Sequence, residues 1–257
     1  MKTTKTLAAL AVVLASCSAF SASKPQFKPL DLEKSTNYIA RQGGILMPKD
    51  NGKRILLWDA TEKAGEAITA FTNADNRLWH IPVTVKGGEL KGCAYKAAKG
   101  VKSERTPAVI VVSEAGKDIP ALSAYPEEAI ACVNASALAD TDPIVFKTRL
   151  EKEIFRAFGF ALGGYSITRT PCVMDLAYSI EDLDANPTVL PSPMRFVGIG
   201  RAAKRLDLPV LRPTFYSMAV RQGWAPAPTN DVQKAIWEKN KDKPAPALGN
   251  MPRYNPR

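Results

Sequence analysis

Hydrophobic residues follow two different periods along the chain. In the first 145 residues, short continuous apolar runs alternate with segments whose apolar residues recur at helical spacing. The continuous runs are typical of buried strands. The clearest run, AVIVVS, has four β-branched residues, and Pro82 favours an edge position for the strand that contains it. We expect a helix at 61–71 and strands at 54–58, 78–85, 108–113 and 130–134.

From Lys147 onward the apolar spacing becomes helical. Leu150, Ile154 and Phe158 recur four residues apart, and the pair Gly163 and Gly164 ends the run. Further helices are expected within 191–206, at 215–222, and at 231–239 with Asn230 as the cap. This order predicts the α/β (α+β) class, with a single domain over 31–243 and a Pro-rich tail over 244–257.

The first residues have the layout of a bacterial secretory signal. Lys2 and Lys5 precede an unbroken apolar run at 7–14, which is much shorter than the roughly 20 residues that a membrane-spanning helix needs. We therefore expect a signal peptide at 1–16, followed by a flexible tether at 17–30.

The end of this signal resembles a lipobox, because Leu14-Ala15-Ser16 precedes Cys17. The resemblance implies cleavage before Cys17 and a lipid on its thiol, which would anchor the chain in a membrane. Ordinary cleavage near Ser21 or Ser23 is the alternative, and it would give a secreted protein. We expect an exported lipoprotein of the cell envelope, at the outer membrane or in the periplasm.

The net charge and the histidine content limit the kinds of partner and of metal site that the chain can have. The chain has 35 Lys and Arg against 25 Asp and Glu, so an anionic envelope ligand is expected as partner. An exported chain without aromatic residues interleaved in a basic stripe is not expected to bind nucleic acid. The single histidine, His80, excludes a three-histidine zinc site within one copy of the chain.

The stretch from Lys152 to Leu162 reads KEIFRAFGFAL and resembles the HExxHxxGxxH motif of metzincin metalloproteases. In that family the histidines bind zinc, the Glu polarises the zinc-bound water, and the Gly ends the helix. The chain has the Glu as Glu153, here a vestigial catalytic residue, and the Gly as Gly159. Lys152, Arg156 and Leu162 stand at the three ligand positions.

Downstream, Cys172-Val173-Met174-Asp175 resembles the CxM of the archaemetzincin branch, in which the Met forms a turn under the metal. The C-terminal stretch resembles that of exported bacterial proteins with the same degenerate helix. Together these features imply a metzincin-like mixed sheet over about 54–180, an active-site-type helix and a helical C-terminal part. The family layout also brings the end of the last strand near the Met-turn, which implies a disulfide between Cys132 and Cys172.

The departures from the motif predict the loss of the metal. Lys152 and Arg156 are cations that repel a dication, and Leu162 has no donor atom, so we expect neither zinc nor another cofactor. Two interpretations remain for the cations. Lys152 and Arg156 are candidate contacts for an anionic group in the old cleft, or Glu153 and Arg156 form an ordinary helical ion pair.

Three functions are compatible with these patterns. The first is a catalytically inactive, metzincin-like binding or scaffolding module of the envelope. The second is an active hydrolase or peptidase that uses Glu153 without the usual zinc site, and the third is a purely structural envelope protein. An open cleft with polar groups and a raised carboxyl pKa would favour an enzyme, whereas a cleft filled by Phe155 and Phe158 would leave only surface binding.

Overall fold

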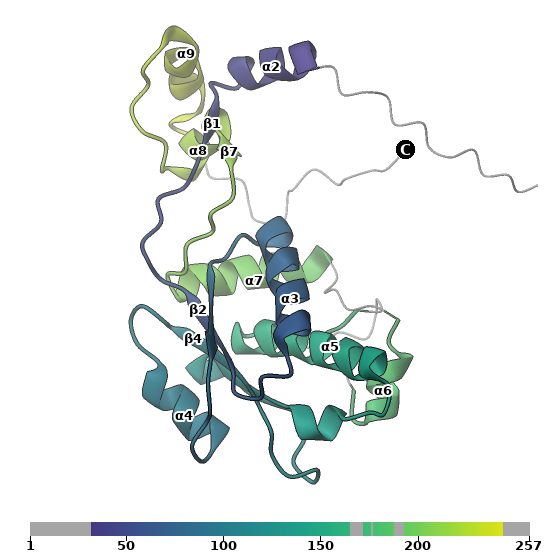
Figure 1. Cartoon of the computed structure of the whole chain (residues 1–257). Helices are drawn as coiled ribbons and strands as arrows, with labels where there is room; N and C mark the ends of the chain where they lie inside the picture. Colours follow the sequence, from purple (N-terminus) through teal and green to yellow (C-terminus); the bar gives the residue numbers. More distant parts are fainter. Residues whose placement is uncertain (1–31, 165–171, 176, 188–192, 244–257) are drawn as a thin grey trace, which may run out of the picture. The chain divides into compact units, whose positions relative to one another are not determined.

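The computed structural model describes residues 32–164, 172–175, 177–187 and 193–243 of the chain (Figure 1). The predicted signal peptide, the tether with Cys17 and the Pro-rich tail lie outside the described residues. Internal contacts divide the chain into two units, Met1–Arg41 and Gln42–Arg257, so helix α2 (Leu32–Arg41) belongs to the first unit. Within the described parts, no helix combines the length and the apolar character that a membrane crossing requires.

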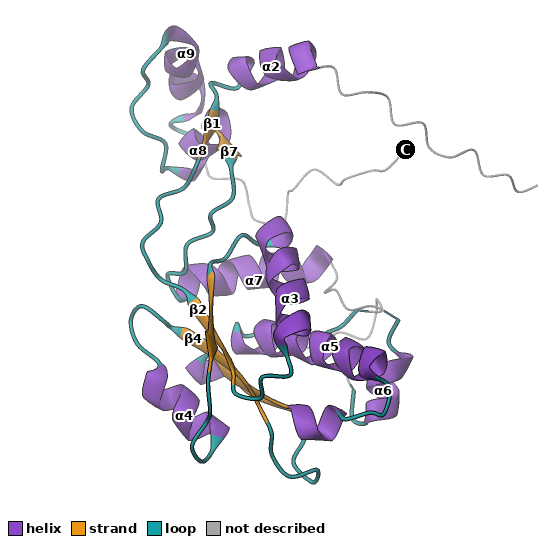
Figure 2. Cartoon of the chain, viewed as in Figure 1, coloured by secondary structure: helices purple, strands orange, loops and turns teal. Residues whose placement is uncertain are grey.

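A five-stranded mixed sheet forms the core of the second unit (Figure 2). The strand order is β3-β2-β4-β6-β5, with β5 antiparallel to β6 and the other neighbours parallel. The strongest predicted strand, β4, is buried along its whole length, and the strand that follows Pro82 lies at the edge, as predicted. The bounds are β2 (Ile55–Asp59), β3 (Val83–Gly87), β4 (Ala108–Ser113), β5 (Leu122–Tyr125) and β6 (Ile130–Asn134).

Helices cover both faces of this sheet. Alternate side chains of a strand point to opposite faces, so Leu57 and Ile110 pack with α3, α5 and α7, whereas Leu56 and Val109 pack with α4 (Figure 2). The short helix α6 contacts α5. The bounds are α3 (Gly65–Leu78), α4 (Ala94–Val101), α5 (Pro143–Ala161), α6 (Ile180–Ala185) and α7 (Pro193–Arg205), with 3-10 turns η1 (Pro126–Glu128) and η2 (Ala135–Leu138).

A second, two-stranded sheet pairs β1 (Ile45–Leu46) with β7 (Thr214–Phe215). It is followed by α8 (Tyr216–Gln222), which ends at Gly223 with φ of 79°, and by α9 (Asp231–Asn240). The side chain of Asn230 accepts the backbone N–H of Gln233 at 2.9 Å. The predicted helices at 215–222 and 231–239, and the predicted cap, are thus confirmed.

Two predicted elements begin later than expected. Thr61 does not start the first helix, because its hydroxyl donates to Asp59 Oδ1 at 2.8 Å in a turn, and α3 begins at Gly65 instead. The predicted strand 78–85 begins only at Val83, since Leu78 ends α3 and His80 adopts a left-handed conformation with φ of 56°. The apolar residues between Leu78 and Val83 pack in the core beside α3 and are not part of a strand.

A buried carboxyl group supports the turn between α3 and β3. Asp75 is 1% exposed, and its backbone carbonyl accepts N–H groups from Trp79 and His80. Burial raises the pKa of its carboxyl group to about 7, against the opposing effect of a hydrogen bond from the Ile81 backbone. Its Oδ1 atom has no partner among the described residues.

We predict that Asp75→Asn reduces the pH dependence of stability. The carboxyl pKa is higher in the folded state, so its stabilising effect is complete below about pH 4 and is lost as the pH rises through about 7. From pH 5 to pH 8, the wild type should lose about 2–4 kcal/mol of unfolding free energy that the variant keeps. Urea unfolding at several pH values measures this difference. The exposed Asp231→Asn is the control, and equal slopes for Asp75→Asn and wild type would contradict the prediction.

Candidate active-site cleft

Helix α5 carries the motif and has clear start and stop signals. Asp142 caps it by accepting the N–H of Ile144 at 2.8 Å, and Pro143 stands at its first position. The helix continues past Gly159 to Ala161, and the chain turns at Gly163 with φ of 77°. The helix therefore ends where the apolar spacing predicts, not at Gly159 as the metzincin motif implies.

The two phenylalanines of this helix face the core. Phe155 and Phe158 are fully buried and meet Phe71 edge to face, with ring centroids 5.1 and 5.2 Å apart. Trp79 packs against the same two rings. Neither phenylalanine is among the residues that line the cleft beside Glu153.

Glu153 and Arg156 form a buried ion pair one helical turn apart. Arg156 Nη1 donates to Glu153 Oε1 at 3.2 Å, and the two residues are 7% and 3% exposed. Burial raises the pKa of the Glu153 carboxyl group to about 7, although the Arg156 charge pulls it down. Among the described residues, Glu153 Oε2 and Arg156 Nε have no hydrogen-bond partner.

Lys152 points to a different partner. Its Nζ donates to the backbone carbonyl of Leu183 in α6 at 2.7 Å, and burial lowers its pKa. Arg149 holds the same helix through two hydrogen bonds to Asp184, at 2.9 and 2.6 Å. Lys152 therefore ties α5 to α6, and it is not among the described residues that line the cleft.

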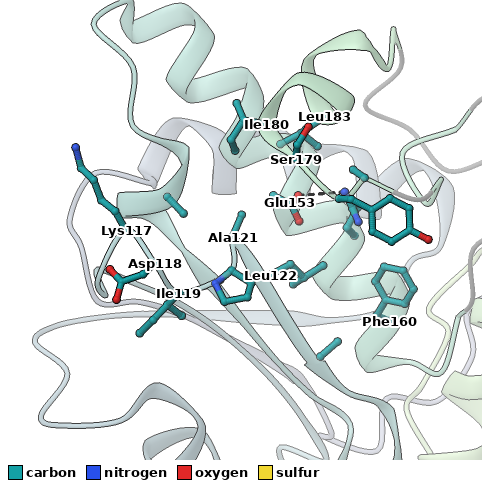
Figure 3. A pocket seen from close by; sticks show the side chains of 16 residues that line it. Lys117, Asp118, Ile119, Ala121, Leu122, Glu153, Phe160, Ser179, Ile180 and Leu183 are labelled. Carbon is teal, nitrogen blue, oxygen red and sulfur yellow. Dashed lines mark hydrogen bonds and ion pairs between the residues drawn. The ribbon is translucent and has the colours of Figure 1, made fainter.

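The cleft is an open cavity of about 490 Å³. Figure 3 shows Glu153 deep among the lining residues, with Lys117 and Asp118 on one side and Phe160 on the other. Most of its lining residues are apolar, and its polar side chains come from the ion pair and from two short segments, 117–118 and 178–179. The lining residues other than Glu153 and Arg156 are Lys117, Asp118, Ile119, Pro120, Ala121, Leu122, Ala124, Ala137, Phe160, Ala177, Tyr178, Ser179, Ile180 and Leu183.

Most of this lining has no distinctive signal in the sequence. It comes from the loop before β5, from β5 itself and from the segment around α6. Strand β5 is four residues long and only half buried, so it carries no long apolar run. Of the predicted site residues that the structure describes, only Glu153 and Arg156 line the cleft.

Gly159 and Met174 meet directly beneath the helix. Any side chain at Gly159 would overlap the Sδ and Cε atoms of Met174. Met174 lies in a turn in which Asp175 N–H donates to the Cys172 carbonyl at 3.0 Å, and Asn186 donates to the same carbonyl at 2.7 Å. Gly159 and Met174, the two residues predicted to have structural roles, thus pack directly against each other.

The donor set at the three ligand positions does not fit zinc. Lys152 is already a hydrogen-bond donor to Leu183, and Arg156 is paired with Glu153. Leu162 is buried in the core and, on a continuous helix, lies about 120° around the axis from Arg156. The described residues include no cluster of three His, Cys, Asp or Glu side chains that could hold a metal ion. His80 does not line the cleft, and burial, together with the Arg212 charge, lowers its pKa.

The expected Cys132–Cys172 disulfide is not formed, and this expectation is corrected here. Cys93, Cys132 and Cys172 are free thiols. Cys132 faces the α4 side of the sheet, whereas Cys172 is buried among the core residues on the α5 side, so the sheet separates the two sulfur atoms. Burial raises the pKa of the Cys132 thiol to about 11.

The mixed sheet, the long helix and the Met174 turn define a metallopeptidase fold of the archaemetzincin type, which confirms the predicted fold. The structure is similar to archaemetzincin from Methanopyrus kandleri, with a TM-score of 0.51 and 18% identity over 62% of this chain and 100% of that chain. The archaemetzincin from Archaeoglobus fulgidus complexed with malonate matches with a TM-score of 0.44 and 16% identity, over 56% of this chain and 99% of that chain.

A zinc-dependent peptidase from Methanocorpusculum labreanum matches with a TM-score of 0.41 and 15% identity, over 56% of this chain and 98% of that chain. No protein-family model and no curated protein matches the chain. At these identities the similarity concerns the fold alone.

We predict that Gly159→Ala destabilises the protein by about 1–3 kcal/mol, because the new methyl group overlaps Met174. In a Met174→Ala background the same change should be neutral or stabilising by up to about 1 kcal/mol, since Ala favours a helix over Gly. Chemical unfolding of the four proteins measures the coupling. Gly100→Ala, in an open and exposed position of α4, is the control that should gain stability. A Gly159→Ala cost that is unchanged by Met174→Ala would contradict the assigned contact.

Proposed function

We propose that the chain is an exported, lipid-anchored binding module of the cell envelope that uses the cleft of a metallopeptidase fold without its zinc. The observation that carries this proposal is the open cavity of about 490 Å³ beside a buried ion pair. A cavity with mostly apolar walls and few placed polar groups is typical of small-ligand sites. In this proposal Glu153 and Arg156 orient a ligand, and the chain has no peptidase activity.

The signal at the N-terminus supports the location. Export would remove Lys2 and Lys5 and leave a mature chain with a net charge of +8, which favours an anionic envelope component as partner. The lipid on Cys17 would hold the folded part at a membrane through the tether.

Lipidation has a direct test. We expect the protein from cells fed a labelled fatty acid to carry the label, and Cys17→Ser to lose it while the chain is still exported. Mass spectrometry of the mature N-terminus gives the cleavage site. An unlabelled wild type cut near Ser21 or Ser23 would show that the chain is secreted without an anchor.

Binding in the cleft is tested with a variant that fills it. Ala121 lies among the lining residues in Figure 3, and Ala121→Phe should block the cavity. We expect the mature chain with Cys17→Ser, which lacks the lipid, to cosediment with envelope fractions, and Ala121→Phe and Arg156→Ala in the same background to weaken this binding at least about tenfold. Ala185→Phe, exposed on α6 and outside the cavity, is the control. Equal binding by all variants would contradict a role for the cleft.

A second candidate is a hydrolase that uses Glu153 as a general base. Two features favour it, because the carboxyl pKa is raised to about 7 and the cavity beside it is open and partly polar. If it holds, a peptide mixture is cleaved, the activity survives chelators, and Glu153→Gln abolishes it. No cleavage by wild type under conditions in which a metallopeptidase control is active would rule this candidate out.

A further inference from the structure

We propose that the cleft recognises a carboxylate carried on an apolar body, which binds between Arg156 and protonated Glu153. This inference rests on the proposed binding function and names the chemical class of the ligand.

Within the part of the chain that the structure describes, the buried pair has unused hydrogen-bonding capacity. Among the described residues, Arg156 Nε and Glu153 Oε2 are both buried, and neither has a partner. An unpaired buried polar group is unfavourable, so a ligand that satisfies both atoms gains affinity. A guanidinium group pairs with a carboxylate through parallel N–H donors, which a point-charge cation cannot do.

The protonation state of Glu153 also bears on the ligand. An ionised Glu153 would repel a carboxylate, whereas a protonated Glu153 would donate its O–H to one, so that two carboxyl groups share one proton. Because burial raises the pKa of Glu153 to about 7, this proton is readily available near neutral pH. The other charged or titratable groups of the described lining are Arg156 on α5, Lys117 and Asp118 on the loop before β5, and Tyr178 before α6. Binding above pH 7 therefore takes up one proton from solvent.

The rest of the cavity is lined mostly by apolar side chains. Leu122 and Ala124 of β5 line it, with Phe160, Ile180 and Leu183 from α5 and α6. These walls suit an aryl or branched alkyl group, and they offer few partners for a hydrated sugar. Inorganic phosphate has no apolar part to bury against these walls.

The test is calorimetric titration of the mature chain with 3-phenylpropionate and with the neutral 3-phenylpropionamide, alongside inorganic phosphate. We expect the acid to bind at least tenfold more tightly than the amide or phosphate at pH 6. Above pH 7 its affinity should fall about tenfold per pH unit, with uptake of one proton measured in buffers of different ionisation enthalpy. The peptide Ac-Ala-Ala-Phe with a free C-terminus, compared with its amide, shows whether a chain end or only a free acid is accepted.

Two variants test the two members of the ion pair, and a third is the control. Glu153→Gln keeps a hydrogen-bond donor without a charge, so it should bind the acid with an affinity that no longer depends on pH. Arg156→Gln should lose at least about tenfold, and Lys96→Gln, exposed on α4 and outside the described lining, should change the affinity less than threefold.

Each contrary result is distinguishable from failure of the binding function. If the amide binds as tightly as the acid, or if the pH dependence persists in Glu153→Gln, the carboxylate inference is wrong. If neither acid nor chain-end probe binds while Ala121→Phe still abolishes envelope binding, the ligand class is wrong and the cleft remains a binding site. If neither probe binds and Ala121→Phe also leaves envelope binding unchanged, the proposed function is wrong as well.

Discussion

The structure depends on the cost of burying charge. Helix α5 carries Lys152, Glu153 and Arg156 at positions that the fold excludes from water, and each buried charge needs a partner. Lys152 finds one in the Leu183 carbonyl, and Glu153 and Arg156 find each other. The Lys152 contact holds α6 beside α5, and the second pairing leaves Glu153 Oε2 and Arg156 Nε without a partner among the described residues. A zinc ion would add two positive charges beside Lys152 and Arg156, and these cations would repel it.

The packing beneath the helix obeys a separate constraint. Gly159 has no side chain because Met174 occupies that space, and the turn around Met174 is held by hydrogen bonds from Asp175 and Asn186. The Gly159–Met174 contact is steric, and the turn is held by hydrogen bonds between protein groups. The fold can therefore keep the Gly and the Met of a metzincin motif while the ligand positions carry different chemistry.

The sequence predicted those parts of the fold whose signals are local. The continuous apolar run of β4, the helical spacing of α5 and the capping by Asn230 each determine an element by themselves. Strand β5 was missed because a short, half-buried strand has no distinctive pattern.

The site was predictable only in part. The identity and helical spacing of Glu153 and Arg156 indicate a pair, which the structure contains. The direction of Lys152 depends on where α6 packs, and the separation of Cys132 from Cys172 depends on which face of the sheet each occupies. Both are tertiary facts, and no spacing in the sequence encodes them.

We propose that the Glu153–Arg156 ion pair leaves this cleft without a zinc site. Metal analysis tests it most directly, on the mature chain purified from cells grown with added zinc and dialysed against buffer without chelator. The account predicts zinc far below one equivalent per chain, unchanged in Glu153→Gln and Arg156→Gln. One equivalent of zinc that survives dialysis in the wild type and is lost in Glu153→Gln would contradict it.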